Sequence, residues 1–327
     1  MSEIAPVFIG IDTSNYTTSL AVADIDGRVI ANIKRLLPVA AGERGLRQSD
    51  AVFAHVKNLP ELLTRLGEAV DGKNVVAVGC STSPRDAEDS YMPCFLVGRD
   101  VGYGMAAVSS APIYEFSHQS GHIMAALYSA NAVSLLEGER FAAFHVSGGT
   151  TEILLVDPKK DSFEVTLAGG TADLNFGQAI DRAGVMMGLS FPCGAEMERI
   201  ALLQKEKPVK FKISVKGLEC NVSGLENQAN ELYKNTKNKA LVCSSVFDFV
   251  GRNLIKLTEN LTEMFGDIPI VYSGGVMSNS IIKDMLSARK NTFFAQPEFS
   301  SDNACGTALL CRMKHLSMVD GENNGSV

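Results

Sequence analysis

The sequence lacks any run of about eighteen apolar residues, which a membrane-spanning helix needs, although 46% of its 327 residues are hydrophobic. It also lacks a Cys-x-x-Cys pair, and its seven cysteines are scattered. This pattern argues against a disulfide framework and against a cysteine-cage zinc site. The N-terminal stretch MSEIAPVFIGID has an acid where a signal peptide carries base, and its apolar run is short. We therefore expect a globular, cytoplasmic protein with a large core and no membrane contact.

Basic side chains are fewer than acidic ones, and the net charge is −7. That balance argues against a general nucleic-acid binder, although it leaves room for a local basic path. One such path is QKEKPVKFKISVK at residues 204–216, and it continues at Lys234, Lys237 and Lys239. Two interpretations stay open: a solvated lysine-rich face, or a contact with an RNA backbone.

Histidine is scarce, with five in the chain, yet His118 and His122 lie four residues apart. Ser117 is a suitable N-cap, and the residues from His118 to Asn131 favour a helix. Residues at i and i+4 share one helix face, so both imidazoles can bind one metal ion. The alternative is a pair of partly buried histidines without a ligand. None of the three residues between them is acidic, so the spacing does not indicate a zincin-type protease.

A weak internal repeat organises the chain. Residues 7–30 predict strand, polar turn, strand, Asp-Gly turn and strand, and residues 141–165 predict the same order with a turn at Asp157-Pro158. A further strand is expected in NVVAVGCSTSP, between two helical segments, and another in IPIVYSGGVMSN, before a helix. Strands that alternate with helices predict an α/β fold.

Three loops of small residues follow these strands: Asp12-Thr13-Ser14, Ser147 to Thr151, and Ser273 to Asn279. Backbone amides in such loops can hold a phosphate. The order of the loops resembles the actin, Hsp70 and sugar-kinase superfamily. That resemblance implies two similar actin-like ATPase lobes, of mixed sheets flanked by helices, with a nucleotide and metal cleft between them. We expect the lobes at residues 1–135 and 136–302, with a helix at 303–318 that packs back on the first.

Within that superfamily, residues 7–312 resemble the Kae1/TsaD family, which makes threonylcarbamoyladenosine in tRNA and is historically labelled glycoprotease. The family's HxxGH-type metal motif is similar to His118 to His122. Its C-terminal metal aspartate is similar to Asp302 in SSDNACGTALL. The resemblance therefore implies one transition metal, Zn²⁺ or Fe²⁺, bound by His118, His122 and Asp302.

The same resemblance implies an adenine-nucleotide site. The family's phosphate loop is similar to VSGGTT, its D-x-x-x-G-x-A-x-D stretch to DLNFGQAID with Gly177 and Asp181, and its serine-glycine-leucine motif to Ser223 to Leu225. The residues expected to bind the nucleotide are Ser147, Gly148, Gly149, Thr150, Thr151, Asp173, Gly194, Glu198, Gly274, Gly275 and Asn279.

Several stretches depart from the family pattern. The chain has GIDTSNYTT where the family has GIETSCDET, and Thr150 replaces a histidine. A longer, charged segment at residues 84–93 replaces a Gly-Pro-Gly loop. We therefore expect a divergent paralogue with altered substrate handling.

The resemblance implies a metal-dependent acyltransferase. It would move a threonylcarbamoyl group from its adenylate to N6 of the adenosine next to the tRNA anticodon. The implied partners are ATP or threonylcarbamoyl-AMP, tRNA, a smaller actin-like paralogue and a small ATPase. Asp12 stays open as a catalytic residue. One alternative is a phosphotransferase or ATPase of the sugar-kinase kind that uses Asp12 and Asp173. The others are a non-catalytic nucleotide-binding paralogue and, least supported, a metalloprotease.

Overall fold

The computed structural model describes residues 4–14, 16–38 and 46–324, which form two compact units. Unit 1 comprises Met1–Glu137, Pro158–Glu164 and Ser301–Val327, and unit 2 comprises Gly138–Asp157 and Val165–Ser300. Ser301 and Asp302 thus belong to unit 1, whereas the sequence predicted them in the second lobe. Within the described ranges, no helix is long and apolar enough to cross a membrane.

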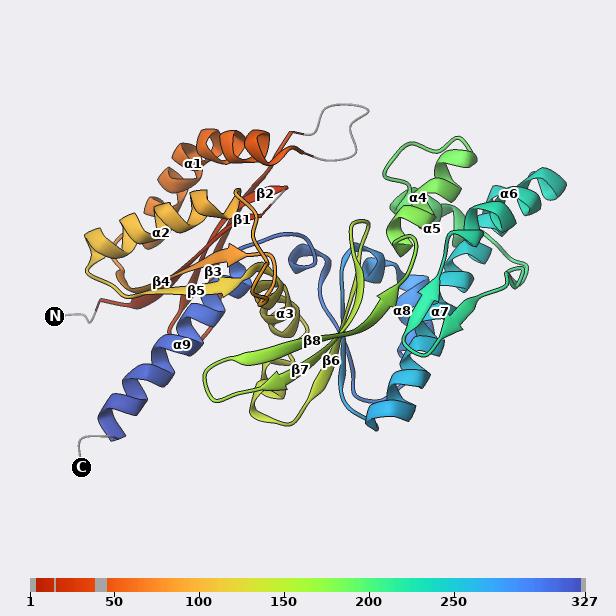
Figure 1. Cartoon of the computed structure of the whole chain (residues 1–327). Coiled ribbons are helices and arrows are strands. Elements are labelled where there is room, and N and C mark those ends of the chain that lie inside the picture. Colours follow the sequence, from red (N-terminus) through yellow and green to blue (C-terminus); the bar gives the residue numbers. More distant parts are fainter. Residues whose placement is uncertain (1–3, 15, 39–45, 325–327) are drawn as a thin grey trace. The chain divides into compact units, whose positions relative to one another are not determined.

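Unit 1 is built on a five-stranded sheet in the order β3-β2-β1-β4-β5 among the described residues. Its strands are β1 (Pro6–Ser14), β2 (Thr17–Asp24), β3 (Val29–Leu36), β4 (Asn74–Ser83) and β5 (Ile113–Ser117). Its helices are α1 (Gln48–Val70), α2 (Phe95–Ser109), α3 (His118–Ser129), the short η1 (Val133–Glu137) and α9 (Cys305–Asn324). Figure 1 shows α1 and α2 on one face of this sheet and α9 on the other.

The two faces of β1 have different neighbours, because successive side chains of a strand point to opposite sides. Val7, Ile9 and Ile11 pack in one cluster with residues of α1 and α2. Phe8 packs with Cys311 of α9 on the other side. Even-numbered residues of β1 therefore face α9, and this alternation directs Asp12 toward the start of that helix.

Helix α9 begins at Cys305 and continues to Asn324, whereas the sequence predicted a helix at 303–318. It packs on α3 and on strands β1, β2 and β4 of unit 1. The predicted N-cap of α3 is present, because the Ser117 hydroxyl accepts a hydrogen bond from the backbone N–H of Ser120 at 3.1 Å. The prediction of a helix that starts at His118 is confirmed.

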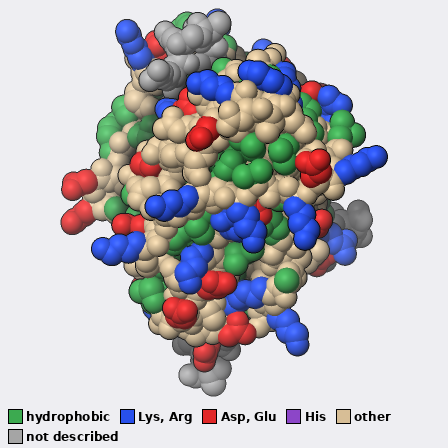
Figure 2. Space-filling view, turned by 90° about the vertical axis from the view of Figure 1, so that its right-hand side faces the viewer, with side chains coloured by type: hydrophobic (Ala, Val, Ile, Leu, Met, Phe, Trp, Pro, Cys, Tyr) green, Lys and Arg blue, Asp and Glu red, His purple; other side chains and the backbone are tan. Residues whose placement is uncertain are grey.

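Unit 2 contains most of a sheet in the order β12-β11-β6-β7-β8-β10-β9, counted over the described residues. Its strands are β6 (Phe141–Val146), β7 (Thr151–Pro158), β8 (Phe163–Thr171), β9 (Ser214–Lys216), β10 (Glu219–Asn221), β11 (Ile270–Ser273) and β12 (Thr292–Phe294). The helices are α4 (Phe176–Met186), α5 (Gly194–Ala201), α6 (Gly224–Thr236), α7 (Lys239–Phe265) and α8 (Ser280–Leu286), with short turns η2 (Gly275–Ser278) and η3 (Pro297–Phe299). Figure 2 looks onto the side that carries α6, where Lys and Arg side chains are spread across the middle of the face.

The two sheets repeat one topology. In the first, β1 pairs antiparallel with β2 and parallel with β4. In the second, β6 pairs antiparallel with β7 and parallel with β11. The run β12-β11-β6-β7-β8 therefore has the order of β5-β4-β1-β2-β3, which confirms the internal repeat.

The turn in the second repeat lies slightly later than the sequence predicted. Pro158 still belongs to β7, and the turn is closed by a hydrogen bond from the Lys159 N–H to the Ser162 carbonyl at 2.9 Å. Proline can end a strand where its missing N–H is not needed for pairing, so Asp157-Pro158 marks the last residues of the strand.

Candidate metal centre and nucleotide pocket

The two histidines lie in the first turns of α3, immediately after β5. Their rings are 4.3 Å apart between centroids, with an interplanar angle of 74°. The side chains are about four-fifths buried, with 19% of His118 and 17% of His122 exposed. Both imidazoles are thus fixed by the helix yet remain reachable by a small ligand.

A close helix crossing brings Asp302 to this pair. A Cβ atom on Gly306, in the first turn of α9, would lie 1.8 Å from the Gly121 carbonyl oxygen of α3. Only glycine permits this approach between the two helix backbones. As a result, Oδ1 of Asp302 lies 3.3 Å from Nε2 of His122 and 3.7 Å from Nε2 of His118.

The three side chains form a donor set suited to a transition metal. One ligand atom from each of His118, His122 and Asp302 lies within 4.8 Å of the others. Two neutral imidazoles and one carboxylate match the ligand types of catalytic zinc and non-haem iron sites, which keep positions open for substrate or water. The residues present therefore fit the metal that the sequence resemblance implied.

Asp12 lies behind the histidine pair. Its Oδ2 atom is 2.8 Å from Nδ1 of His118, and its Oδ1 accepts the backbone N–H of Ser14 at 2.9 Å. A carboxylate only accepts, so Nδ1 of His118 carries the donated proton and Nε2 is the atom directed at Asp302. Such carboxylate–histidine pairs orient a metal ligand and raise its basicity. The sequence left Asp12 open as a catalytic residue; in the structure its carboxylate is hydrogen-bonded to His118 on the side of the imidazole away from Asp302.

Electrostatics favour a cation at this centre. Burial by itself lowers the pKa of His118, but the facing carboxylate of Asp12, helped by Asp302, raises that pKa to about 9. Burial raises the pKa of Asp302, yet His122 and His118 outweigh it and hold that pKa well below its usual range. The surrounding groups therefore stabilise positive charge where the three ligand atoms converge.

The charged segment that departs from the family pattern is fastened beside this centre. The Oδ2 atom of Asp86 accepts hydrogen bonds from the hydroxyls of Ser117 at 2.9 Å and Ser120 at 2.8 Å. The Gln119 N–H donates to the Pro84 carbonyl at 3.0 Å. Residues 84–86 are thus tied to the first turn of α3, where an acidic side chain is favourable.

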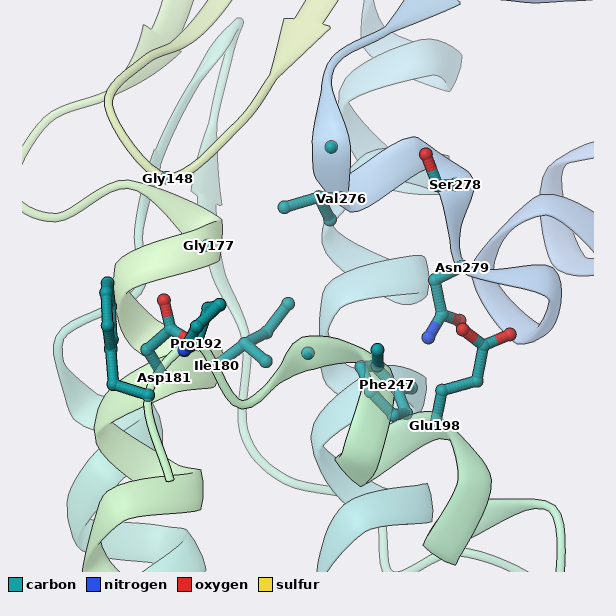
Figure 3. Close-up of a pocket in the computed structure, with 14 residues that line it drawn as sticks. Gly148, Gly177, Ile180, Asp181, Pro192, Glu198, Phe247, Val276, Ser278 and Asn279 are labelled. Carbon is teal, nitrogen blue, oxygen red and sulfur yellow. The ribbon is translucent and has the colours of Figure 1, made fainter. Parts of the chain in front are cut away.

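Unit 2 contains a separate pocket of about 370 Å³, a volume suited to a small-molecule ligand. Figure 3 shows the Glu198 and Asn279 side chains pointing toward one another at one end and Asp181 beside Pro192 at the other. The pocket is lined by Gly148, Gly177, Ile180, Asp181, Phe191, Pro192, Gly194, Ala195, Glu198, Phe247, Gly275, Val276, Ser278 and Asn279.

Part of the predicted nucleotide set lies at this pocket and part does not. The structure brings together five of the predicted residues on its wall: Gly148, Gly194, Glu198, Gly275 and Asn279. The other predicted residues, which do not line the pocket, are Ser147, Gly149, Thr150, Thr151, Asp173 and Gly274. In the predicted phosphate loop, Ser147 and Thr150 bond to each other, with the Ser147 N–H 2.8 Å from the Thr150 carbonyl.

The Asp173 carboxylate is occupied by hydrogen bonds from the backbone of unit 2. Its carboxylate accepts the backbone N–H groups of Leu174 at 2.7 Å, Val222 at 2.9 Å and Ser223 at 3.1 Å. Burial alone raises the pKa of Asp173, but a hydrogen bond from the Ser223 side chain, together with the three from the backbone amides, outweighs it and lowers that pKa. The side chain therefore joins the end of β8 to the turn before α6.

Glu198 and Asn279 are both fixed by the first turn of α8. Oε1 of Glu198 accepts the backbone N–H of Ser280 at 2.8 Å and its hydroxyl at 2.6 Å. Oδ1 of Asn279 accepts the N–H of Ile282 at 3.1 Å as the N-cap. Two polar side chains are thus held in defined rotamers at one end of the pocket, where they can bind a polyhydroxyl ligand.

Glycine is required where two segments of the pocket wall meet. A Cβ atom on Gly177 would lie 2.6 Å from the Cα atom of Gly148. This contact brings the first turn of α4 against the β6–β7 loop. A larger residue would force the two segments apart.

Sequence inspection missed the apolar wall made by Ile180, Phe191, Phe247 and Val276. Phe247 is in the middle of α7 and only 1% exposed, so in sequence it looks like an ordinary core residue. Phe191 is 75% exposed. A phenylalanine directly before a proline, in LSFPCG, was the one sequence signal that could have identified it.

The comparisons with known proteins agree on one family. A sequence model of the TsaD family, described as tRNA N6-adenosine threonylcarbamoyltransferase, matches residues 90–309, more than half of the chain. The protein of that name from Methanopyrus kandleri is 25% identical over 326 residues, which cover 97% of this chain and 90% of the relative. The one from Neorickettsia sennetsu is 26% identical over 290 residues, which cover 86% and 83%.

Solved structures share the fold at low identity. HypF of T. kodakarensis aligns with a TM-score of 0.58 and 13% identity, over 98% of this chain and 48% of that one. A ROK family glucokinase from Streptomyces griseus aligns with a TM-score of 0.51 and 14% identity, over 94% and 99%. These likenesses bear on the fold alone, and they confirm the predicted actin-like α/β class. The family-model match over more than half of the chain establishes by itself that the chain belongs to the TsaD family.

Proposed function

We propose that this chain transfers a threonylcarbamoyl group from its adenylate to N6 of an adenosine in tRNA. The proposal is supported by the family match and by relatives that are named for this reaction on tRNA. The observation that carries it is the convergence of His118, His122 and Asp302 within 4.8 Å, with Asp12 orienting His118.

One transition metal, Zn²⁺ or Fe²⁺, would be held by His118, His122 and Asp302. When bound, it supplies a Lewis acid and a template for the acyl donor. Asp12 holds the proton on Nδ1 of His118, so the lone pair on Nε2 is available to the metal. The hydrogen bond to Ser14 fixes Asp12 in turn. These roles belong to unit 1 and are testable without substrate.

The AMP part of the donor is proposed to bind in the pocket of unit 2. The carboxylate of Glu198 and the amide of Asn279 can bond to ribose hydroxyls, and the apolar wall around Phe247 and Ile180 can cover the adenine. At Gly148 and Gly275 the backbone can come close to the phosphate. AMP is already a good leaving group, so the chain needs no nucleophilic side chain for this reaction.

The alternative functions have weaker support. A phosphotransferase would use Asp12 and Asp173 as base and magnesium ligand, yet Asp12 is bonded to His118 and Ser14, and Asp173 to three backbone amides. A purely structural paralogue does not need a convergent His-His-Asp set. A protease needs a general base beside the metal, and the residues between the two histidines supply none.

The first test of the proposal is binding. Titration of metal-free protein with Zn²⁺ or Fe²⁺ should give one site per chain, lost in His122→Ala with an unchanged circular-dichroism spectrum. Titration of the same protein with AMP should give one further site that His122→Ala leaves in place. If metal binding were the same in His122→Ala, the metal centre would be wrongly assigned.

A further inference from the structure

A lysine-rich segment and the adjoining helix form one exposed basic surface on unit 2. Residues 204–239 contain eight lysines and four glutamates, whereas the chain as a whole has a net charge of −7. We define the lysine face as Lys205, Lys207, Lys210, Lys212, Lys234 and Lys237, all of them exposed. Among the residues that the structure describes, none of the six forms an ion pair with a carboxylate, and the Lys237 ammonium lies over the Tyr233 ring, 5.5 Å from its centroid.

Exposed and buried side chains alternate along residues 210–215, as in an extended chain, so the lysines of this stretch point outward. Phe211 is buried, Ile213 and Val215 are partly buried, and Lys210 and Lys212 are exposed between and beside them. In an extended chain, alternate residues lie about 6.6 Å apart on one side. Lys210 and Lys212 therefore present two ammonium groups in a row, with the apolar side chains against the core of unit 2.

Side chains of the underlying helices fix this backbone. The Gln228 amide of α6 accepts the Lys212 N–H at 2.7 Å and donates to the Lys212 carbonyl at 3.2 Å. The Arg252 guanidinium of α7 donates to the Phe211 carbonyl at 2.7 Å, and the Val209 N–H donates to the Ser245 hydroxyl at 2.9 Å. A segment without regular secondary structure is thus anchored at four points, so its lysines project from a defined scaffold.

The basic surface continues on α6, and its first lysine follows the helix that carries a residue of the pocket. Lys234 lies in the last turn of α6, and Lys237 follows it as the C-cap residue. At the other end, Lys205 comes four residues after Ala201, the last residue of α5, which also carries Glu198 of the pocket. Figure 2 shows Lys and Arg side chains across the middle of this side of unit 2.

We propose that the lysine face binds the phosphate backbone of the RNA substrate, an inference that rests on the proposed function. An anionic polymer is attracted by ammonium groups that no carboxylate neutralises, because each phosphate contact releases counterions. Lysines on the edge strand of a sheet can serve only to prevent pairing with another strand, but that role would need charge on the edge strand β9 alone. Here the lysines extend over a loop and a helix C-terminus. Lys216 of β9 is left out, because it lies opposite Glu219.

The test compares two double variants in tRNA binding by the full chain, measured by fluorescence anisotropy at several salt concentrations. Lys210→Ala with Lys212→Ala should weaken binding about tenfold at low salt and reduce the salt slope by about two. The matched control is Lys160→Ala with Lys290→Ala, two exposed lysines outside the face, which should bind like the wild type. A second arm, Lys234→Ala with Lys237→Ala, should behave like the first.

Equal binding by the Lys210/Lys212 variant and the control would overturn the proposal, as would absence of tRNA binding by the wild type at low salt. Thermal melting of each variant checks that the fold is unchanged. Acyl transfer is scored separately on the same proteins. Transfer by a wild type whose lysine variants bind normally would reject only the lysine face. Lysine-dependent binding without transfer would reject only the proposed reaction.

Discussion

Oδ2 of Asp12 lies 2.8 Å from Nδ1 of His118, on the side of the imidazole away from Asp302. Asp12 is 1% exposed and comes from β1, whereas His118 opens α3 more than a hundred residues later. Burial by itself raises the pKa of Asp12, but the imidazole outweighs it and lowers that pKa. The imidazole thus favours the ionised form of the buried Asp12 carboxylate, and the carboxylate in turn orients His118, the proposed metal ligand.

Replacing Asp12 should therefore weaken metal binding without removing a ligand. We expect Asp12→Asn to lower the affinity for Zn²⁺ by about 10- to 100-fold, because the amide no longer holds His118 as a carboxylate does. The measurement is calorimetric titration of metal-free protein. The control is Asp26→Asn, at an exposed aspartate of the β2–β3 turn, which should titrate like the wild type. An unchanged affinity in Asp12→Asn would show that Asp12 does not position His118.

The crossing of α3 and α9 gives a second prediction. Gly306→Ala places a methyl group 1.8 Å from the Gly121 carbonyl oxygen, so the helices must separate. We expect a loss of about 2–3 kcal/mol in the free energy of unfolding and weaker metal binding, because Asp302 moves with α9. Gly321→Ala on the same helix meets no atom within 4 Å and should be neutral or stabilising. Similar unfolding curves for both variants would contradict the close crossing.

The pocket prediction concerns Glu198. We expect Glu198→Ala to weaken AMP binding by roughly tenfold, which corresponds to one charged hydrogen bond of about 1.5 kcal/mol. Glu196→Ala is the matched control, since Glu196 is on the same helix, pairs with Arg199 at 2.7 Å and does not line the pocket. The measurement is calorimetric titration of each variant with AMP, and the two affinities are compared. Loss of affinity in the Glu196 variant alone would place the nucleotide elsewhere.

A buried histidine gives a prediction on pH. His55 of α1 is 0% exposed, and its Nδ1 lies 2.8 Å from the Thr18 hydroxyl. Burial lowers the pKa of His55 below 6.5. The unfolded chain therefore takes up a proton on His55 near pH 6.5, while the folded chain does not. As a result, the contribution of neutral His55 to the free energy of unfolding is present above pH 6.5 and is lost as the pH falls.

The measurement is denaturant unfolding of the wild type and His55→Asn between pH 7.5 and 5.5. The wild type should lose more stability than the variant as pH falls, by at most about 1.4 kcal/mol per pH unit. Using the difference between the two proteins cancels the other titrating groups, His118 among them. Parallel curves would mean that His55 takes up its proton equally in both states.

The sequence predicted much of the fold because the repeat is local. Apolar β-branched strands that stop at small polar loops identify β1, β2, β6 and β7 without tertiary information. The same holds for the start of α3, where the Ser117 cap and the i,i+4 histidines are neighbours in sequence. The end of α9 was misplaced because the polar residues after position 318 do not break a helix.

The arrangement of the site was harder to predict. The contact of Asp12 with His118 depends on which face of β1 turns toward α9, and that follows only from the packed sheet. Asp173 seemed to be a nucleotide ligand, but its carboxylate is used by backbone amides from a turn some fifty residues away. Phe247 could not be distinguished from a core residue, because the pocket wall and the core of unit 2 share one helix. Long-range partners of this kind leave no trace in a single sequence.

The most direct measurement of the central claim is the transfer reaction itself. Metal-loaded protein is incubated with threonylcarbamoyl adenylate and tRNA, with family-type partner subunits added in a parallel reaction, and the digested tRNA is analysed by mass spectrometry. The account predicts threonylcarbamoyl groups on adenosine with the wild type, and a loss of at least about a hundredfold with His122→Ala. Unmodified tRNA in both reactions, from a protein that binds metal and AMP, would contradict the proposed function.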